Sequence, residues 1–191
     1  MIYLDYTANT PADPDVLDAY LAAERRYIAN PNSTTLPAGG PRRDGAGDPI
    51  HCAAPWRAAC EIIYTSGASE ANNLALKGIA HASRHIGKHI ISTQLEHSSV
   101  GASLSALQQQ GYEIDLLDIG RDGRVDLDQL RELMRDDTIL VAVCAVDSEL
   151  GTIQPIREIA EIVKPYPGCR LHVDATQAVG KTTSGLTASI R

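Results

Sequence analysis

The feature that most constrains the fold is a series of short apolar runs, rich in β-branched residues, that alternate with segments of helical periodicity. Most of these runs are apolar at nearly every position, which is typical of strands covered on both faces in a parallel sheet. The alternation predicts an α/β chain in which a mainly parallel sheet is flanked by helices. The expected strands are EIIYT (61–65), HIIST (89–93), YEIDLLDI (112–119), TILVAVCAV (138–146) and CRLHVDA (169–175).

Helices are expected between these runs, where apolar residues recur at helical spacing. The first should begin after Asp13, a favourable N-cap residue, with Pro14 in its first turn. Another opens on Pro155. The expected helices cover 14–28, about 70–85, 97–110, 126–136 and 155–164.

Composition narrows the class of protein further. A chain of 191 residues that is 43% hydrophobic can bury one sizeable core. Its net charge of −7 comes from 24 acidic and 17 basic side chains, with no basic cluster, so neither nucleic acid nor a membrane is an expected partner. The sequence shows no secretory leader and no apolar window of membrane-spanning length, so a cytoplasmic location is expected.

Cysteine and histidine spacing is not typical of a disulfide framework or a metal site. The cysteines at 52, 60, 144 and 169 show no CxxC spacing, so buried free thiols are expected. His81 and His85 lie one helical turn apart, with His89 close by, which is acceptable ligand spacing. No carboxylate or cysteine near them completes a ligand set. A solvated helix end is the preferred interpretation, and no metal is predicted.

A phosphate site is suggested by YTSGASEANN. A strand should end at Thr65, a tight turn of small residues should follow, and a helix should begin near Ser69. The backbone N–H groups at a helix N-terminus, together with the hydroxyls of Ser66 and Ser69, can bind a phosphate. The alternative is that Ser69 is a plain N-cap residue.

Other polar side chains are expected at the carboxyl ends of strands, the edge where ligands bind in open α/β sheets. Glu96 and His97 follow one strand, and the His97 imidazole could stack on a ring or move protons. Asp174 ends another strand, with Gln177 just after it. The alternatives are a structural histidine, an aspartate that caps the following helix, and a solvated glutamine.

Together these groups suit pyridoxal 5'-phosphate as cofactor. It has a phosphate, a flat ring, a phenolic oxygen and a pyridine nitrogen that must stay protonated for the ring to act as an electron sink. A buried carboxylate beside that nitrogen stabilises its positive charge.

Several motifs then resemble a known family. IYLDYTANTP, NPNS, IIYTSGASEANNLALKG, EHSSV, RDDTILV, ELGTIQPI and HVDATQAVGK are similar, in family order, to the N-terminal half of the cysteine desulfurases, which are class V aminotransferase-like enzymes of fold-type I. The resemblance implies that 1–191 is a truncated form of the large cofactor-binding domain and that the C-terminal small domain is absent. It also implies removal of sulfur from L-cysteine as an enzyme persulfide, a homodimer, and a sulfur-acceptor or scaffold protein as partner.

The resemblance also implies roles for individual residues. Ala68 and Ser69 would hold the cofactor phosphate, and His97 would stack on the pyridine ring and assist proton transfer. Asp174 would pair with the ring nitrogen, and Gln177 would approach the phenolic oxygen.

The chain departs from the family pattern in several places. Ser148 stands where the family has an asparagine that contacts the cofactor, so this contact is expected to be lost or water-mediated. Residues 34–60 are rich in proline and glycine and show neither the helical nor the strand periodicity of apolar residues. A shifted reading frame is a hypothesis that would explain this. Residues 182–191 also leave the pattern.

The Schiff-base lysine and the persulfide-forming cysteine of the family have no match in this sequence. Lys181 matches a lysine without that role, and none of the four cysteines matches the nucleophile. The chain alone is therefore expected to be inactive or nearly so. The alternatives left open are another class V enzyme, such as a selenocysteine lyase, and a non-catalytic remnant or dimerisation partner.

Overall fold

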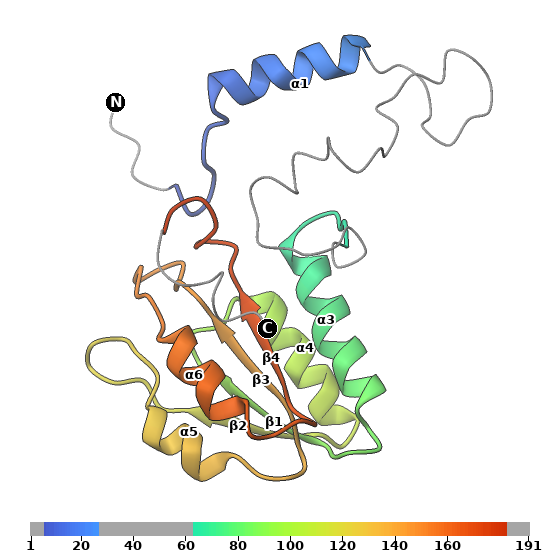
Figure 1. The fold of residues 1–191 in the computed structure, drawn as a ribbon, viewed down its shortest axis with the longest axis vertical. Helices are drawn as coiled ribbons and strands as arrows, with labels where there is room; N and C mark the ends of the chain where they lie inside the picture. The colour runs from blue at the N-terminus through green and yellow to red at the C-terminus, as the bar shows by residue number, and fades with distance from the viewer. Residues whose placement is uncertain (1–5, 27–62, 183–191) are drawn as a thin grey trace, which may run out of the picture. The chain divides into compact units, whose positions relative to one another are not determined.

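The computed structural model describes residues 6–26 and 63–182, shown in colour in Figure 1. The chain divides into two compact units, Met1–Ile63 and Tyr64–Arg191. In the first unit, helix α1 (Pro14–Arg26) begins where the sequence predicts, because Asp13 Oδ1 accepts a hydrogen bond of 2.9 Å from the Asp15 backbone N–H. The segment 34–60, with its suggested frame shift, lies outside the described residues.

The second unit contains a parallel four-stranded sheet, which confirms the predicted α/β class. Its order is β2-β1-β3-β4, and every neighbouring pair is parallel. Each strand lies within an expected run. The strands are β1 (His89–Thr93), β2 (Glu113–Leu117), β3 (Thr138–Cys144) and β4 (Arg170–Asp174).

The strand expected at 61–65 is wrong for its described part. Residues 63–65 adopt no regular structure, and the rest of the run is not described. Ile63 and Tyr64 are 72% and 76% exposed, so the described residues give them neither a pairing strand nor a covering layer. An apolar β-branched run forms a strand only where another strand lies beside it.

The helices predicted between the strands are all present, with shifted ends. Helix α3 begins earlier than expected because Gly67 is its N-cap residue, and helix α5 ends earlier because Met134 is already extended. The bounds are α3 (Ala68–Ala82), α4 (Ser98–Gln109), α5 (Leu127–Leu133) and α6 (Ile156–Val163).

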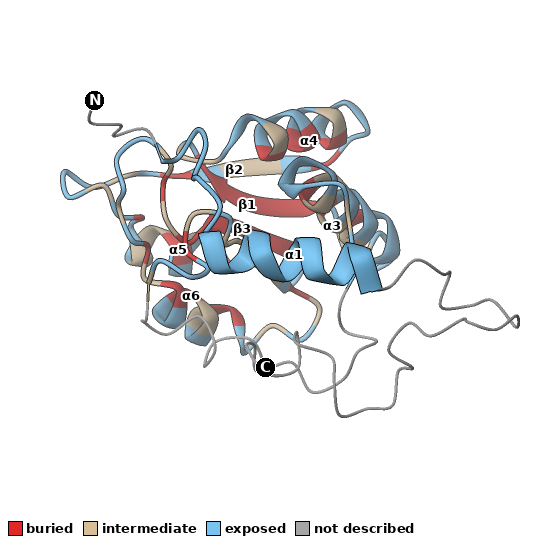
Figure 2. Ribbon diagram, turned by 90° about the horizontal axis from the view of Figure 1, so that it is seen from above, coloured by how far each residue is buried: buried red, intermediate tan, exposed pale blue. Residues whose placement is uncertain are grey.

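Helices cover both faces of the sheet, as Figure 2 shows. Ile90 packs with α3 and α4 in one core cluster, whereas its neighbour Ile91 packs with α5 and α6 in the other. Every residue of β1 and β3 is buried, while β2 and β4 are partly exposed at the edges. This double cover explains why the central runs are almost continuously apolar.

The strand order places a switch point between β1 and β3. Helix α4, which follows β1, lies on one face, and helix α6, which follows β3, lies on the other. In open α/β sheets, ligands bind at the carboxyl ends of the strands at such a point. None of the described helices is long and apolar enough to span a membrane.

Candidate functional site

Glu96 bridges the carboxyl ends of the two central strands at the switch point. Its Oε1 accepts hydrogen bonds from Thr93 Oγ1 at 2.9 Å and from the Cys144 backbone N–H at 2.8 Å. Its Oε2 is buried and has no hydrogen-bond partner among the described residues. Burial raises the pKa of Glu96 to about 7, although the hydrogen bonds from Cys144 and Thr93 oppose this rise.

Asp174, at the carboxyl end of β4, accepts three hydrogen bonds from neighbouring side chains and backbone. Its Oδ1 accepts from Thr176 through the backbone N–H at 3.0 Å and the hydroxyl at 2.6 Å. Its Oδ2 accepts from Asn72 Nδ2 at 2.8 Å. Burial alone would raise its pKa, but the hydrogen bonds from Thr176 and Asn72, together with His172, hold that pKa below its usual value.

The donor set around Asp174 fits the nitrogen of a pyridine ring. A carboxylate offers about four lone-pair positions, and hydrogen bonds from two residues occupy three of them. An ionised carboxylate with one remaining acceptor position is what a protonated ring nitrogen requires. Asp174 also caps the turn that follows β4 through Thr176, so the capping alternative and the cofactor prediction are compatible.

His97 lies just beyond β1 as the N-cap residue of α4, with its ring exposed. Its Nδ1 accepts from the Ser99 backbone N–H at 3.2 Å and lies 2.9 Å from Ser99 Oγ. The ring is therefore held by one nitrogen at this edge of the sheet.

Ala68 and Ser69 form the exposed first turn of α3. The N-cap residue is Gly67, in an extended conformation and without a side-chain capping bond, so the alternative that Ser69 is the cap is wrong. Nearby, Glu70 Oε2 accepts a hydrogen bond of 2.6 Å from the Ser66 backbone N–H, which lowers the pKa of Glu70. The start of a helix favours an anion, and Glu70 already places one there.

The remaining predicted residues lie in turns beyond β3 and β4. Gln177 is half-buried, and its Oε1 accepts from Lys181 Nζ at 2.6 Å. Ser148 has no side-chain hydrogen bond within the described part of the chain. The adjacent Asp147 is buried and caps its own turn by accepting from the backbone N–H groups of residues 149 and 150.

One residue of this site is missing from the sequence prediction. Asn72 is only 3% exposed and contacts Asp174 from helix α3. The sequence places Asn72 on the buried face of α3 by its spacing, because the buried residues of this helix, Asn72, Leu76 and Ala80, lie four positions apart. A polar residue on the buried face of a helix needs partners, and this pattern could have revealed it.

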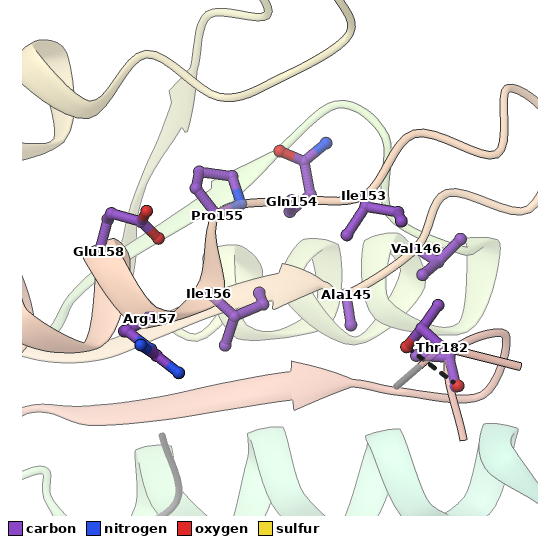
Figure 3. Close-up of a pocket in the computed structure, with 10 residues that line it drawn as sticks. Ala145, Val146, Ile153, Gln154, Pro155, Ile156, Arg157, Glu158 and Thr182 are labelled. Carbon is purple, nitrogen blue, oxygen red and sulfur yellow. Dashed lines mark hydrogen bonds between the residues drawn. The ribbon is translucent and has the colours of Figure 1, made fainter. Parts of the chain in front are cut away.

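A cavity of about 330 Å³ lies beside α6 (Figure 3). Ala145, Val146, Ile156 and Thr182 are among its lining residues, and none of the predicted site residues lines it. Gln154, Arg157 and Glu158 also line this cavity, so its walls are partly polar.

Known proteins resemble this chain in both sequence and fold. The profile of the aminotransferase class-V family matches residues 2–188. The mitochondrial cysteine desulfurase of Arabidopsis thaliana is 42% identical over 182 residues, which cover 94% of this chain and 40% of that protein. The putative cysteine desulfurase IscS 1 of Bacillus subtilis is 41% identical over 181 residues, with 94% and 47% covered.

Solved structures agree with this result. A NifS-like protein superposes with a TM-score of 0.84 at 29% identity, over 99% of this chain and 52% of that one. A structure of SspA in complex with cysteine gives a TM-score of 0.74 at 30% identity, over 92% and 51%.

The fold and the profile match define a protein of the class V aminotransferase type, and this chain belongs to that family. Within the family, its relatives confirm the predicted resemblance to the N-terminal half of the cysteine desulfurases. The chain spans less than half the length of these curated relatives. The matched range includes 34–60.

Proposed function

We propose that this chain binds pyridoxal 5'-phosphate at the carboxyl edge of its sheet and forms the cofactor-binding part of a cysteine desulfurase. The reaction would convert L-cysteine to L-alanine and leave the sulfur as an enzyme persulfide. One observation carries the proposal: Asp174 is held ionised with one acceptor position remaining, at the edge where His97 also lies. The names of the relatives support the reaction, and the cysteine in one neighbouring structure supports the substrate.

Each predicted residue has a defined task in this proposal. The bound cofactor would supply an electron sink for bonds at the amino-acid α-carbon. Asp174 would keep the ring nitrogen protonated, and His97 would offer a flat ring for stacking and a nitrogen for proton transfer. Ala68 and Ser69 would bind the phosphate through the start of α3. Gln177, whose Oε1 accepts from Lys181 Nζ, would approach the phenolic oxygen.

Ser148 is too short to replace the amide that the family carries at this position, so its contact with the cofactor would pass through water. We therefore expect weaker cofactor binding than in a protein with asparagine there. The variant Ser148→Asn should tighten binding.

Turnover would require groups outside those assigned above. Cys144 and Cys169 are buried free thiols whose pKa is raised by burial to about 12, which makes them poor nucleophiles. Lys181 lies in an exposed turn, bonded to Gln177. We therefore propose that these 191 residues bind cofactor but release little or no sulfur alone, and that a homodimer and a sulfur-acceptor protein belong to the complete system.

Cofactor titration tests the proposal. The chain and its Asp174→Asn variant are titrated with pyridoxal 5'-phosphate and followed by absorbance and equilibrium dialysis, with Asp128→Asn as control because Asp128 is 90% exposed. Loss of the charge at Asp174 should weaken binding about tenfold or more, since hydrogen bonds to charged groups contribute about 1.5–3 kcal/mol. Equal affinity of Asp174→Asn and the parent chain, or no binding by the folded parent chain, would refute the proposal.

A further inference from the structure

Asn72 connects three elements of the site through one buried amide. From helix α3, its Nδ2 donates to Ser99 Oγ of α4 at 3.1 Å and to Asp174 Oδ2 of β4 at 2.8 Å. Its Oδ1 lies 3.0 Å from His172 Nε2. Both N–H groups and the carbonyl are therefore used, although Asn72 and Asp174 are 102 positions apart in the sequence.

The chemistry of the partners permits only one orientation of this amide. A flipped amide would place its carbonyl oxygen against the carboxylate of Asp174, and two acceptors would then face each other. Burial lowers the pKa of His172, although Asp174 opposes this, so the imidazole is neutral and has one N–H. That proton must be on Nε2, because Asn72 Oδ1 can only accept.

The hydrogen-bond network extends from Asn72 through Ser99 to His97. Ser99 Oγ accepts from Asn72, so its own proton is available for His97 Nδ1, 2.9 Å away. The Ser99 backbone N–H also donates to that nitrogen. With Nδ1 accepting, a neutral His97 carries its proton on Nε2, the nitrogen away from this network.

We propose that Asn72 is a positioning residue that orients the Asp174 carboxylate and, by directing the Ser99 hydroxyl, adds a second hydrogen bond to His97 Nδ1 beside the one from the Ser99 backbone N–H. Its relevance to catalysis rests on the function proposed above, but both effects can be measured without the cofactor. Asn72 itself does not meet the reacting atoms. It supplies a donor that keeps Asp174 ionised, and it directs the hydroxyl proton of Ser99 toward His97.

Replacing the amide by an acid separates this role from simple packing. Asn72→Asp keeps the shape of the side chain but removes both N–H donors and places a second carboxylate against Asp174. Two carboxylates at that separation share a proton, so we expect the titration midpoint of Asp174 to rise by at least about one pH unit. Gln109→Glu makes the same amide-to-acid change at an exposed position of α4 and should leave that midpoint unchanged.

A second variant isolates the connection to His97. Ser99→Ala removes the hydroxyl while the contact between Asn72 and Asp174 remains. Nitrogen-15 NMR of the histidine rings should then show the His97 Nδ1 resonance move downfield, toward that of an imidazole nitrogen with fewer hydrogen bonds, while the backbone N–H of residue 99 keeps the proton on Nε2. Ser105→Ala, at an exposed position of the same helix, is the matched control.

The cofactor provides the third measurement. Asn72→Asp should weaken binding of pyridoxal 5'-phosphate about tenfold or more, since it removes a hydrogen bond to a charged group. The control variants should bind like the parent chain. Unchanged Asp174 titration in a folded Asn72→Asp variant, or an unchanged His97 Nδ1 resonance in Ser99→Ala, would overturn the inference.

The outcomes also separate this inference from the proposed function. If the parent chain binds no cofactor but the Asp174 midpoint and the His97 Nδ1 resonance move as expected, the inference holds and the proposed function fails. If the cofactor binds and neither NMR signal moves, the function holds and the inference fails. Should Asn72→Asp not fold, the Ser99→Ala spectrum decides the inference.

Discussion

Glu96 Oε1 accepts a hydrogen bond of 2.8 Å from the backbone N–H of Cys144, which ties the carboxyl end of β1 to that of β3. The other oxygen of this carboxyl group is buried without a partner among the described residues. A buried carboxyl group with one unpaired oxygen is more stable neutral than ionised. The edge that carries His97 and Asp174 therefore includes a group that titrates near neutral pH.

This carboxyl group should make the stability of the fold depend on pH. The pKa of Glu96 rises from 4.5 to about 7 on folding, so the native state binds the proton more tightly than the unfolded state. The resulting stabilisation is fully present below about pH 4.5 and is lost as pH rises through 7. We expect this loss to be on the order of 2 kcal/mol between pH 5 and pH 8. Urea unfolding across that range measures it.

The variant Glu96→Gln is the control for that titration, because its Oε1 can still accept from Thr93 and Cys144 but cannot ionise. Other groups titrate equally in both proteins, including His172, whose lowered pKa works in the opposite direction. The difference between the two unfolding free energies should therefore grow from about pH 4.5 and level off above about pH 7. A difference that stays constant with pH would show that Glu96 is not protonated in the native state.

The buried thiols should react slowly in the folded chain. Burial raises the pKa of Cys144 and Cys169 to about 12, so thiolate is scarce at pH 8. We expect alkylation by iodoacetamide to be at least about 100-fold slower than in urea, because only the thiolate is nucleophilic. Peptide mass spectrometry resolves each cysteine. Equal rates in both states would contradict the burial of these thiols. In that case burial would no longer make them poor nucleophiles.

The sequence was sufficient to predict the central sheet and its carboxyl edge, because covered parallel strands require continuous apolar runs. His97 and Asp174 were found for the same reason, since each follows such a run directly. Asn72 was missed because its partners come from distant segments and the hydrogen bonds appear only when α3 packs on the sheet. The strand predicted at 61–65 was wrong for its described part, because local composition does not reveal whether a neighbouring strand exists. The cytoplasmic location stays a prediction.

Two glycines should respond in opposite ways to alanine. Gly78 lies within α3, where an added Cβ meets nothing within 4 Å, so Gly78→Ala should stabilise the fold by about 0.5–1 kcal/mol. At Gly87 the added Cβ would overlap the Asp137 carbonyl oxygen, a backbone atom that can make room only if the chain itself shifts. Gly87→Ala should therefore lower the urea midpoint, while Gly78→Ala raises it. A neutral Gly87→Ala variant would contradict the close approach of these two backbone segments.

A pair of leucines on α3 tests whether this helix, which carries Asn72, is held to the sheet by its buried face. Leu76 is fully buried and packs in the cluster with Ile90, whereas Leu74 is 53% exposed. Leu76→Ala should cost about 2–5 kcal/mol through lost burial and the cavity that remains. Leu74→Ala should cost less than about 1 kcal/mol, since little of its surface leaves water on folding. Chemical denaturation of both variants gives the comparison.

Because α3 positions Asn72, the Leu76→Ala variant should also weaken cofactor binding. Equal destabilisation by the two variants would mean that α3 does not dock through the face that carries Asn72, Leu76 and Ala80.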